Sequence, residues 1–285
     1  MKYILAIGLL MLGLTSNAQN ELKRFMQPAN VVNKIPYGAN AEAGNYIQSG
    51  TAKIYYELYG KGEPFVLLHG GLFGSTIEMA DFIDSLSKTY LVIAISTRGH
   101  GKSELGHDLV SLEQRANDVK RVIQKVTNKQ VMMLGFSDGG YTAYQFGVLF
   151  PELVKKMIVI GAGVLKPGQR DFNFNVQQAM ALDQAFWKQQ LALMPAPNRL
   201  PELFKQINDC YSNLTIDKAM LEKIKCPVLV MAGDRDEGNP VENVLKAASF
   251  IPNHQLAIIP NTGHPTFNEN FAAAWACVLP FIKNK

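Results

Sequence analysis

Residues 134–143 read LGFSDGGYTA and place Ser137 between two glycines, directly behind an apolar run. A G-x-S-x-G segment between a strand and a helix forms a sharp turn that holds the serine hydroxyl at the carboxyl edge of a parallel sheet, an arrangement called a nucleophile elbow. Gly135 and Gly139 lack side chains, so the strand and the helix can approach closely around this turn. The bare motif is weak, but this setting strongly indicates that Ser137 is a nucleophile.

Short apolar runs alternate with longer amphipathic stretches on both sides of this segment. Residues 112–126 carry apolar side chains at helical spacing and predict one of the intervening helices. Strands that are apolar on both sides and separated by helices indicate a parallel sheet covered on both faces. The sequence therefore predicts an α/β fold. Strands are predicted at 53–58, 65–68, 91–95, 131–134, 157–160, 228–232 and 255–259.

A long interval separates the strand ending near residue 160 from the one beginning near residue 228. Ordinary connections have roughly 4 to 6 residues, so this interval must contain structure of its own. Helical patterns at 176–193 and 200–211 predict a small helical cap over residues 163–222. Phe186 and Trp187 lie in it and are candidates for the wall of a substrate pocket. The alternative is that they pack within the helical layer.

Residues 1–45 precede the predicted core. Lys2, the uncharged apolar run 4–14 and the small residues around Ala18 are typical of a secretory signal peptide over residues 1–18. We expect cleavage after Ala18 and export to the periplasm or medium, with no stable membrane insertion. A membrane anchor is disfavoured, because a helix over 4–14 would be about 17 Å long against a hydrocarbon core of ~30 Å. Residues 19–45 predict an irregular N-terminal arm without visible chemistry.

Composition narrows the possible partners. The 28 basic and 24 acidic residues give a net charge of +4 without a dense basic cluster, so nucleic acid is not an expected partner. Neither H-E-x-x-H nor paired C-x-x-C occurs, and no metal or other cofactor is expected. Cys210, Cys226 and Cys277 are an odd number in a chain too large to need disulfides, which predicts buried thiols with at most one disulfide.

A serine nucleophile needs a base and an acid that orients the base. His264, in the segment PNTGH after the last predicted strand, would emerge at the same sheet edge as Ser137. The strand 228–232 is followed by Gly-Asp-Arg-Asp, and spacing alone leaves both Asp234 and Asp236 open as the acid. The order Ser, Asp, His along the chain is that of the α/β hydrolases.

The segment STRGHGKS at 96–103 offers a different class of function, because its end resembles a phosphate-binding P-loop. The P-loop pattern requires a glycine where Ser96 stands, and no helix is expected immediately after Ser103. Nucleotide binding is therefore disfavoured.

Together the motifs HGG at 69–71, RGHGKS at 98–103, GFSDGG at 135–140, GDRD at 233–236 and TGH at 262–264 resemble those of α/β-hydrolase fold serine hydrolases. The resemblance covers nearly all of the chain from about residue 46. It implies a mostly parallel eight-stranded sheet, with a core of residues 46–162 and 223–285. It also selects Asp236 as the acid.

In similar enzymes two backbone amides stabilise the oxyanion. Here the resemblance assigns them to Gly71, with Leu72 in reserve, and to Asp138. Leu72 is also a candidate substrate contact. Similar enzymes often have an aspartate where this chain has Ser96, and this departure leaves the expected Ser137, Asp236 and His264 unaffected.

The elbow GFSDGG resembles the GWSDGG-type elbow of valacyclovirase-like (biphenyl hydrolase-like) enzymes, in which the acid meets the ammonium of an α-amino-acid ester. Asp138 would then bind substrate; alternatively it caps the following helix. We expect a serine hydrolase acting on a carboxylic ester of a small or medium acid. The alternatives are an amino-acid ester hydrolase, an aminopeptidase-like amidase, and a non-catalytic small-molecule binding module on the same fold.

Overall fold

The computed structural model describes residues 22–27 and 35–284. The predicted signal peptide lies outside these residues. The strands are β1 (Gly44–Ser49), β2 (Ala52–Tyr59), β3 (Glu63–Leu68), β4 (Tyr90–Ile95), β5 (Val131–Phe136), β6 (Val154–Ile160), β7 (Val228–Gly233) and β8 (His254–Ile259). They form a single eight-stranded sheet in the order β1-β2-β4-β3-β5-β6-β7-β8.

The sheet is mixed but mostly parallel. β1 pairs antiparallel with β2, and β2 pairs antiparallel with β4, whereas the other neighbours are parallel. The predicted α/β-hydrolase sheet is thereby confirmed. The α-helices are α1 (Ala80–Leu86), α2 (Leu112–Val126), α3 (Asp138–Leu149), α4 (Val176–Leu182), α5 (Gln184–Leu193), α6 (Leu200–Ser212), α7 (Lys218–Leu221), α8 (Val241–Phe250), α9 (Thr266–Glu269) and α10 (Phe271–Lys283); the 3-10 helices are η1 (Thr76–Met79), η2 (Pro151–Leu153) and η3 (Pro197–Arg199).

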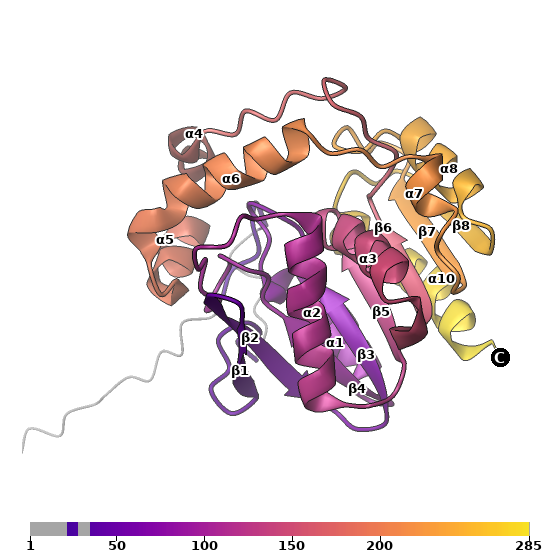
Figure 1. Cartoon of the computed structure of the whole chain (residues 1–285), viewed down its shortest axis with the longest axis horizontal. Helices are drawn as coiled ribbons and strands as arrows, with labels where there is room; N and C mark the ends of the chain where they lie inside the picture. Colours follow the sequence, from indigo (N-terminus) through magenta and orange to yellow (C-terminus); the bar gives the residue numbers. More distant parts are fainter. Residues whose placement is uncertain (1–21, 28–34, 285) are drawn as a thin grey trace, which may run out of the picture.

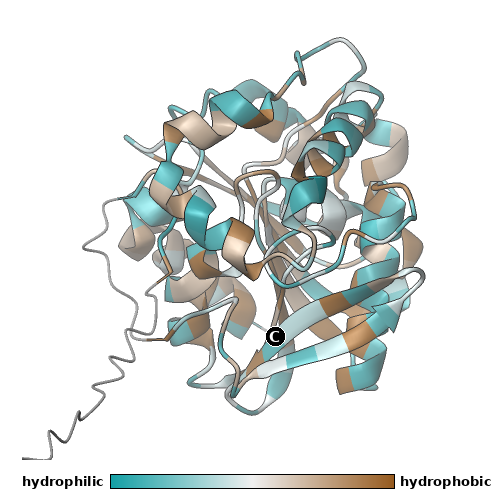
Figure 2. Cartoon of the chain, turned by 90° about the vertical axis from the view of Figure 1, so that its left-hand side faces the viewer, coloured by the Kyte–Doolittle hydropathy of each residue, from teal (hydrophilic) through white to brown (hydrophobic). Residues whose placement is uncertain are grey.

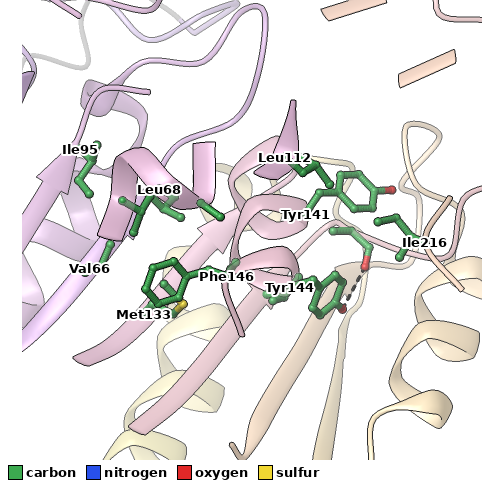
Figure 3. Packing of buried hydrophobic residues seen from close by; sticks show 14 of the residues in the cluster. Val66, Leu68, Ile95, Leu112, Met133, Tyr141, Tyr144, Phe146 and Ile216 are labelled. Atoms are coloured by element: carbon green, nitrogen blue, oxygen red, sulfur yellow. Dashed lines mark hydrogen bonds between the residues drawn. The ribbon is translucent and has the colours of Figure 1, made fainter. Parts of the chain in front are cut away.

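Helices cover both faces of the sheet (Figure 1). Alternate side chains of β5 enter two different cores: Met133 packs with residues of α2, α3 and α8, whereas Leu134 packs with residues of α1 and α10. Figure 3 shows part of the first core, where Met133 lies near Val66 of β3 and Phe146 of α3. Figure 2 shows the strands of the interior mainly in hydrophobic colours. Burial on both faces explains why the central strands are continuously apolar.

The helix α2 illustrates how the sequence specifies one covering layer. The Ser111 side chain accepts a hydrogen bond from Gln114 N and so satisfies one of the free N–H groups of the first turn. Leu112, Ala116 and Val119 follow at helical spacing, and all are buried. One apolar stripe therefore holds α2 on the sheet.

Residues 163–222, which we call the cap, contain α4, α5, η3, α6 and α7. Figure 1 shows α4, α5 and α6 as a group to one side of the sheet. The cap thus has the helical content expected from its sequence. Within the described residues, no helix is long and apolar enough to span a bilayer. Cys210, Cys226 and Cys277 are free thiols.

Candidate active site

Ser137 lies in the turn between β5 and α3 with φ 52° and ψ −113°, a conformation that L-residues rarely adopt. Its N–H donates to Ile160 O at 2.8 Å, which ties the turn to β6. A Cβ at Gly139 would lie 2.4 Å from Leu68 O, and one at Gly135 would lie 2.2 Å from Gly139 O. Only glycine fits at these two positions, so the sequence pattern around Ser137 follows from the close approach of β3, β5 and α3.

His264 joins Ser137 to Asp236. The distance from His264 Nε2 to Ser137 Oγ is 2.8 Å, and the distances from His264 Nδ1 to Asp236 Oδ2 and Oδ1 are 2.8 and 3.0 Å. In this network Nδ1 carries the proton that it donates to the carboxylate, which leaves Nε2 free to accept from the serine hydroxyl. The Asp236 side chain is fully buried, whereas that of His264 is 28% exposed. The His264 ring is thus open to solvent on one side and held by a buried carboxylate on the other.

The structure separates the two aspartates that spacing left open. Asp236 also accepts a hydrogen bond from Asn239 N at 2.7 Å, so its carboxylate is fixed in the turn after β7. Asp234 instead accepts from Thr262 N at 3.2 Å and is exposed. Of the two, Asp236 is the one that reaches His264.

Ser137 and His264 lie on the wall of a cavity of about 590 Å³. Its lining is mostly apolar, a composition typical of small-molecule sites. Residues of the core, the cap and the N-terminal arm contribute to it. The lining residues besides Ser137 and His264 include Arg24, Phe25, Met26, Gln27, Gly71, Leu72, Phe73, Glu78, Phe136, Asp138, Tyr141, Arg170, Phe172, Phe174, Ile207, Tyr211, Asn239 and Asn268.

Gly71 and Asp138, which the resemblance assigns to the oxyanion hole, lie side by side on this wall. A Cβ at Gly71 would be 2.8 Å from Asp138 Cβ. Asp138 is the first residue of α3, and the N–H groups of a helix's first turn have no partner within the helix. Leu72, with φ 53°, is buried and also lines the cavity. This arrangement can supply two backbone donors beside the Ser137 hydroxyl.

The Asp138 carboxylate is engaged in a way that neither sequence hypothesis anticipated. Its Oδ1 accepts hydrogen bonds from Arg115 Nη1 of α2 and from the Tyr211 hydroxyl of the cap. Burial and the neighbouring carboxylate raise the pKa of Tyr211 well above its usual value, so the hydroxyl keeps its proton. The side chain does not cap α3, because neither carboxylate oxygen of Asp138 accepts a hydrogen bond from an N–H group of that helix. Asp138 Oδ2 is buried and has no hydrogen-bond partner among the described residues.

A buried histidine and a partly buried glutamate hold the loop after β3. His69 Nδ1 lies 2.6 Å from Gly70 O, and Thr97 N donates to His69 Nε2 at 2.9 Å. Burial lowers the pKa of His69 to about 4, so the ring is neutral and braces the loop. Glu78 accepts a hydrogen bond from Gly70 N, and burial raises the pKa of its carboxyl to about 8. Sequence reasoning missed Glu78, because no motif marks it.

The RGHGKS loop is occupied by internal contacts. Arg98 is buried, and its Nη2 and Nε donate to Asp118 at 2.8 and 2.9 Å. Ser103 Oγ donates to Ser96 O at 2.6 Å, and Ser96 Oγ lies 3.0 Å from Thr76 Oγ1. The helix that follows, α2, begins only at Leu112. The loop therefore braces the sheet edge and lacks the helix N-terminus that a P-loop needs.

Phe186 and Trp187 do not line the cavity, which corrects the expectation that they form its wall. Both are buried, and Trp187 Nε1 donates to Ala179 O at 2.9 Å within the cap. Phe186 packs against Phe25, and Trp187 packs against Phe73. They thus lie behind the two rings that form the wall. Phe25 belongs to the arm for which no chemistry was expected.

No group of three or more His, Cys, Asp or Glu side chains that could hold a metal ion occurs within residues 22–27 and 35–284.

Comparison with known proteins supports the α/β-hydrolase fold. The model of the alpha/beta hydrolase fold family matches residues 63–214. A 2-hydroxy-6-oxo-6-(2'-aminophenyl)hexa-2,4-dienoic acid hydrolase from Metapseudomonas resinovorans is 26% identical over 259 residues, which are 79% of this chain and 86% of that protein. Serine hydrolase BPHL of Mus musculus is 25% identical over 228 residues, 74% of this chain and 76% of that protein.

A solved structure of similar sequence extends the agreement to three dimensions. The crystal structure of a serine hydrolase involved in carbazole degradation (CarC enzyme) has a TM-score of 0.71 and 26% identity, and covers 84% of this chain and 98% of that one. Because the family model spans more than half of the sequence and the sheet has the same fold, the chain belongs to the α/β hydrolase fold family.

Proposed function

We propose that the protein is an exported serine hydrolase that cleaves a carboxylic ester of a small or medium acid through Ser137, His264 and Asp236. One observation carries the proposal: a continuous hydrogen-bonded chain from the buried Asp236 through His264 to Ser137 Oγ ends at a mostly apolar cavity. Structural serines seldom have a strained backbone, a histidine partner and access to a cavity at once.

The geometry supports a two-step mechanism. His264 Nε2 takes the proton from Ser137 Oγ as the oxygen attacks the ester carbonyl, while Asp236 stabilises the imidazolium that forms. The N–H groups of Gly71 and Asp138 stabilise the oxyanion. Collapse of the intermediate expels the alcohol, which takes the proton from His264. A water molecule, deprotonated by His264, then hydrolyses the acyl-enzyme.

An ester is the favoured substrate class, because its alkoxide leaving group needs only the proton that His264 supplies. A C–C hydrolase is a second candidate. It is favoured by the similarity to the Metapseudomonas dienoic acid hydrolase, which covers most of both chains. The same triad is used for different bonds on this fold, so a substrate panel must decide.

An amino-acid ester hydrolase, or an aminopeptidase-like amidase, is less well supported. Arg115 already balances the charge of Asp138, whose Oδ1 is fully engaged, so a substrate ammonium would meet a neutralised acid. The similarity to serine hydrolase BPHL keeps this substrate class in the panel.

The proposal of export rests on the sequence of residues 1–18. It is tested by N-terminal sequencing of the protein recovered from the periplasm or medium.

The decisive experiment is exposure of the purified protein to a fluorophosphonate probe, followed by a panel of p-nitrophenyl esters, amino-acid esters and a vinylogous diketone. Labelling of Ser137, found by mass spectrometry and lost in Ser137→Ala, is expected together with ester turnover. A protein that neither reacts with the probe nor turns over any compound would instead be a small-molecule binding module.

A further inference from the structure

The short segment 22–27, which we call the wall segment, lies along the catalytic cavity. Arg24, Phe25, Met26 and Gln27 all contribute to the cavity lining, on the same wall as the loop after β3. The segment lies outside the hydrolase core and the cap, and the sequence assigned it no chemistry. It nevertheless touches both of them.

Phe25 stands between the loop after β3 and the cap. Its ring stacks on Phe73 with centroids 4.6 Å apart and an interplanar angle of 11°. It meets Phe186 of α5 edge-on, with centroids 5.3 Å apart. Phe25 is half-buried, so part of its ring remains open to the cavity. Aromatic pairs of this geometry stabilise the position of the ring beyond the effect of area burial alone.

Polar contacts hold the segment to the cap. Lys23 Nζ forms an ion pair with the Asp183 carboxylate. Met26 N donates to Asp183 Oδ2 at 2.8 Å, and Lys23 N donates to Gln189 Oε1 at 2.7 Å. Asp183 is also the N-cap of α5, where its Oδ1 accepts from Phe186 N. One aspartate thus fixes both the start of α5 and the wall segment.

Arg24 holds the opposite side of the segment to the core. Its Nη1 donates to Asp81 Oδ2 of α1 at 2.8 Å and to Asn268 Oδ1 of α9 at 3.0 Å. Arg24 is buried, and Asn268 lies four residues after His264. Buried charge-assisted hydrogen bonds of this kind are stronger than those between neutral groups. The wall segment is therefore attached to the cap through Lys23 and to the core through Arg24.

We propose that the wall segment determines substrate size. Phe25 limits the length or bulk of the acyl group, and Lys23 and Arg24 hold the wall segment, and with it Phe25, in position. The inference rests on the proposed serine hydrolase function and adds a specificity determinant to it. Phe25 blocks the part of the cavity between Phe73 and the cap. Removal of the ring opens that space to longer acyl chains.

The test compares p-nitrophenyl acetate with p-nitrophenyl octanoate in the full chain. Phe25→Ala is expected to raise the octanoate-to-acetate ratio of kcat/KM by at least about tenfold, since each methylene accommodated in an apolar pocket changes specificity by roughly 10- to 200-fold. Phe25→Leu gives a smaller rise, and it replaces the alanine variant if that one does not fold. Lys23→Met raises the ratio by releasing the segment, whereas Lys23→Arg, which keeps the ion pair, retains the wild-type ratio.

Two controls separate specificity from stability and from activity. Phe146→Leu removes part of a buried ring of α3 that does not line the cavity, so it lowers the melting temperature without changing the ratio. Fluorophosphonates with short and long alkyl groups report access to Ser137 without ester turnover, and their relative labelling rates are expected to shift in the same direction in Phe25→Ala.

The possible failures are distinguishable. A wild-type protein that reacts with neither probe nor ester refutes the proposed function itself. A wild-type protein that reacts, together with folded Phe25 variants whose acyl preference and relative labelling rates stay within about twofold of wild type, overturns the inference about the wall segment.

Discussion

Arg115 forms a fully buried ion pair with Asp138, the residue that directly follows Ser137. It links α2 to the nucleophile elbow, and Tyr211 of the cap donates to the same carboxylate oxygen. The Asp138 side chain is therefore held by α2 and by the cap, directly beside Ser137.

Asp138→Asn leaves Arg115 buried without a counter-charge and is expected to lower the free energy of unfolding by about 3–5 kcal/mol. The double variant Arg115→Met with Asp138→Asn recovers much of that loss, because no buried charge remains. Urea denaturation followed by circular dichroism measures both. If Asp138→Asn were as stable as wild type but selectively lost turnover of an amino-acid ester relative to its des-amino analogue, the carboxylate would be a substrate-binding group.

The second prediction concerns the catalytic hydrogen-bond chain. Ser137→Ala abolishes turnover and probe labelling with little change in melting temperature. Asp236→Asn lowers kcat by about 10⁴, because an amide in place of the acid favours the wrong tautomer of His264. Asp234→Asn is the matched control, since Asp234 is exposed and its carboxylate accepts a hydrogen bond from Thr262 N and not from His264. A severe loss in Asp234→Asn together with a mild one in Asp236→Asn would reverse the assignment of the acid.

The third prediction concerns the approach of α3 to the sheet. In Gly139→Ala the new Cβ meets the backbone oxygen of Leu68 at 2.4 Å, so β3 and the elbow must separate. We expect a large fall in melting temperature and loss of activity. Gly147→Ala is the control in the same helix, because the one close approach of its Cβ is to the flexible end of Met157, while Ile224 lies at ordinary contact distance. Alanine is also favoured over glycine in a helix by about 1 kcal/mol. Equal effects of the two substitutions would show that the close contact is not limiting.

The fourth prediction concerns pH. Burial raises the pKa of the Glu78 carboxyl to about 8 in the folded state, from 4.5. Between these values the folded protein holds a proton that the unfolded chain has released, so the Glu78 contribution to stability is complete below pH 4.5 and is lost as the pH rises towards 8.

Glu78→Gln removes this dependence. The difference in unfolding free energy between wild type and Glu78→Gln, measured by urea denaturation from pH 4.5 to 8.5, is expected to move steadily in favour of the glutamine variant. His69 titrates in both proteins and drops out of the difference. Parallel stability curves would mean that the Glu78 carboxyl titrates normally.

The sequence alone predicted those parts of the structure in which a local pattern is compatible with one conformation only. The strands of the sheet interior are apolar on both sides, which set the α/β class, and the glycines around Ser137 marked the elbow. β1 escaped detection because it is an edge strand in which half of the residues are exposed, Tyr46 among them, so it has no continuous apolar run. Its existence is decided by pairing with β2.

Local sequence patterns could not predict contacts between segments that are far apart in the chain. Asp236 and Asp234 have almost the same neighbours in sequence, and only the turn after β7 decides which one faces His264. Phe186 and Trp187 are as aromatic as a pocket wall requires, but packing places Phe25 and Phe73 between them and the cavity. The apolar character of a side chain indicates that it will be buried. It does not indicate whether the side chain will line a cavity or lie behind the residues that do.

The sequence by itself therefore determined the α/β class, the elbow at Ser137 and the order Ser, Asp, His along the chain. Only the tertiary structure decided that Arg115 neutralises Asp138 and that residues 22–27 complete the cavity. Such contacts join residues that are far apart along the chain, as Lys23 and Asp183 are. The packing of the layers decides which residues meet in such contacts, and the spacing of residues within one element does not. Local sequence patterns therefore cannot predict them.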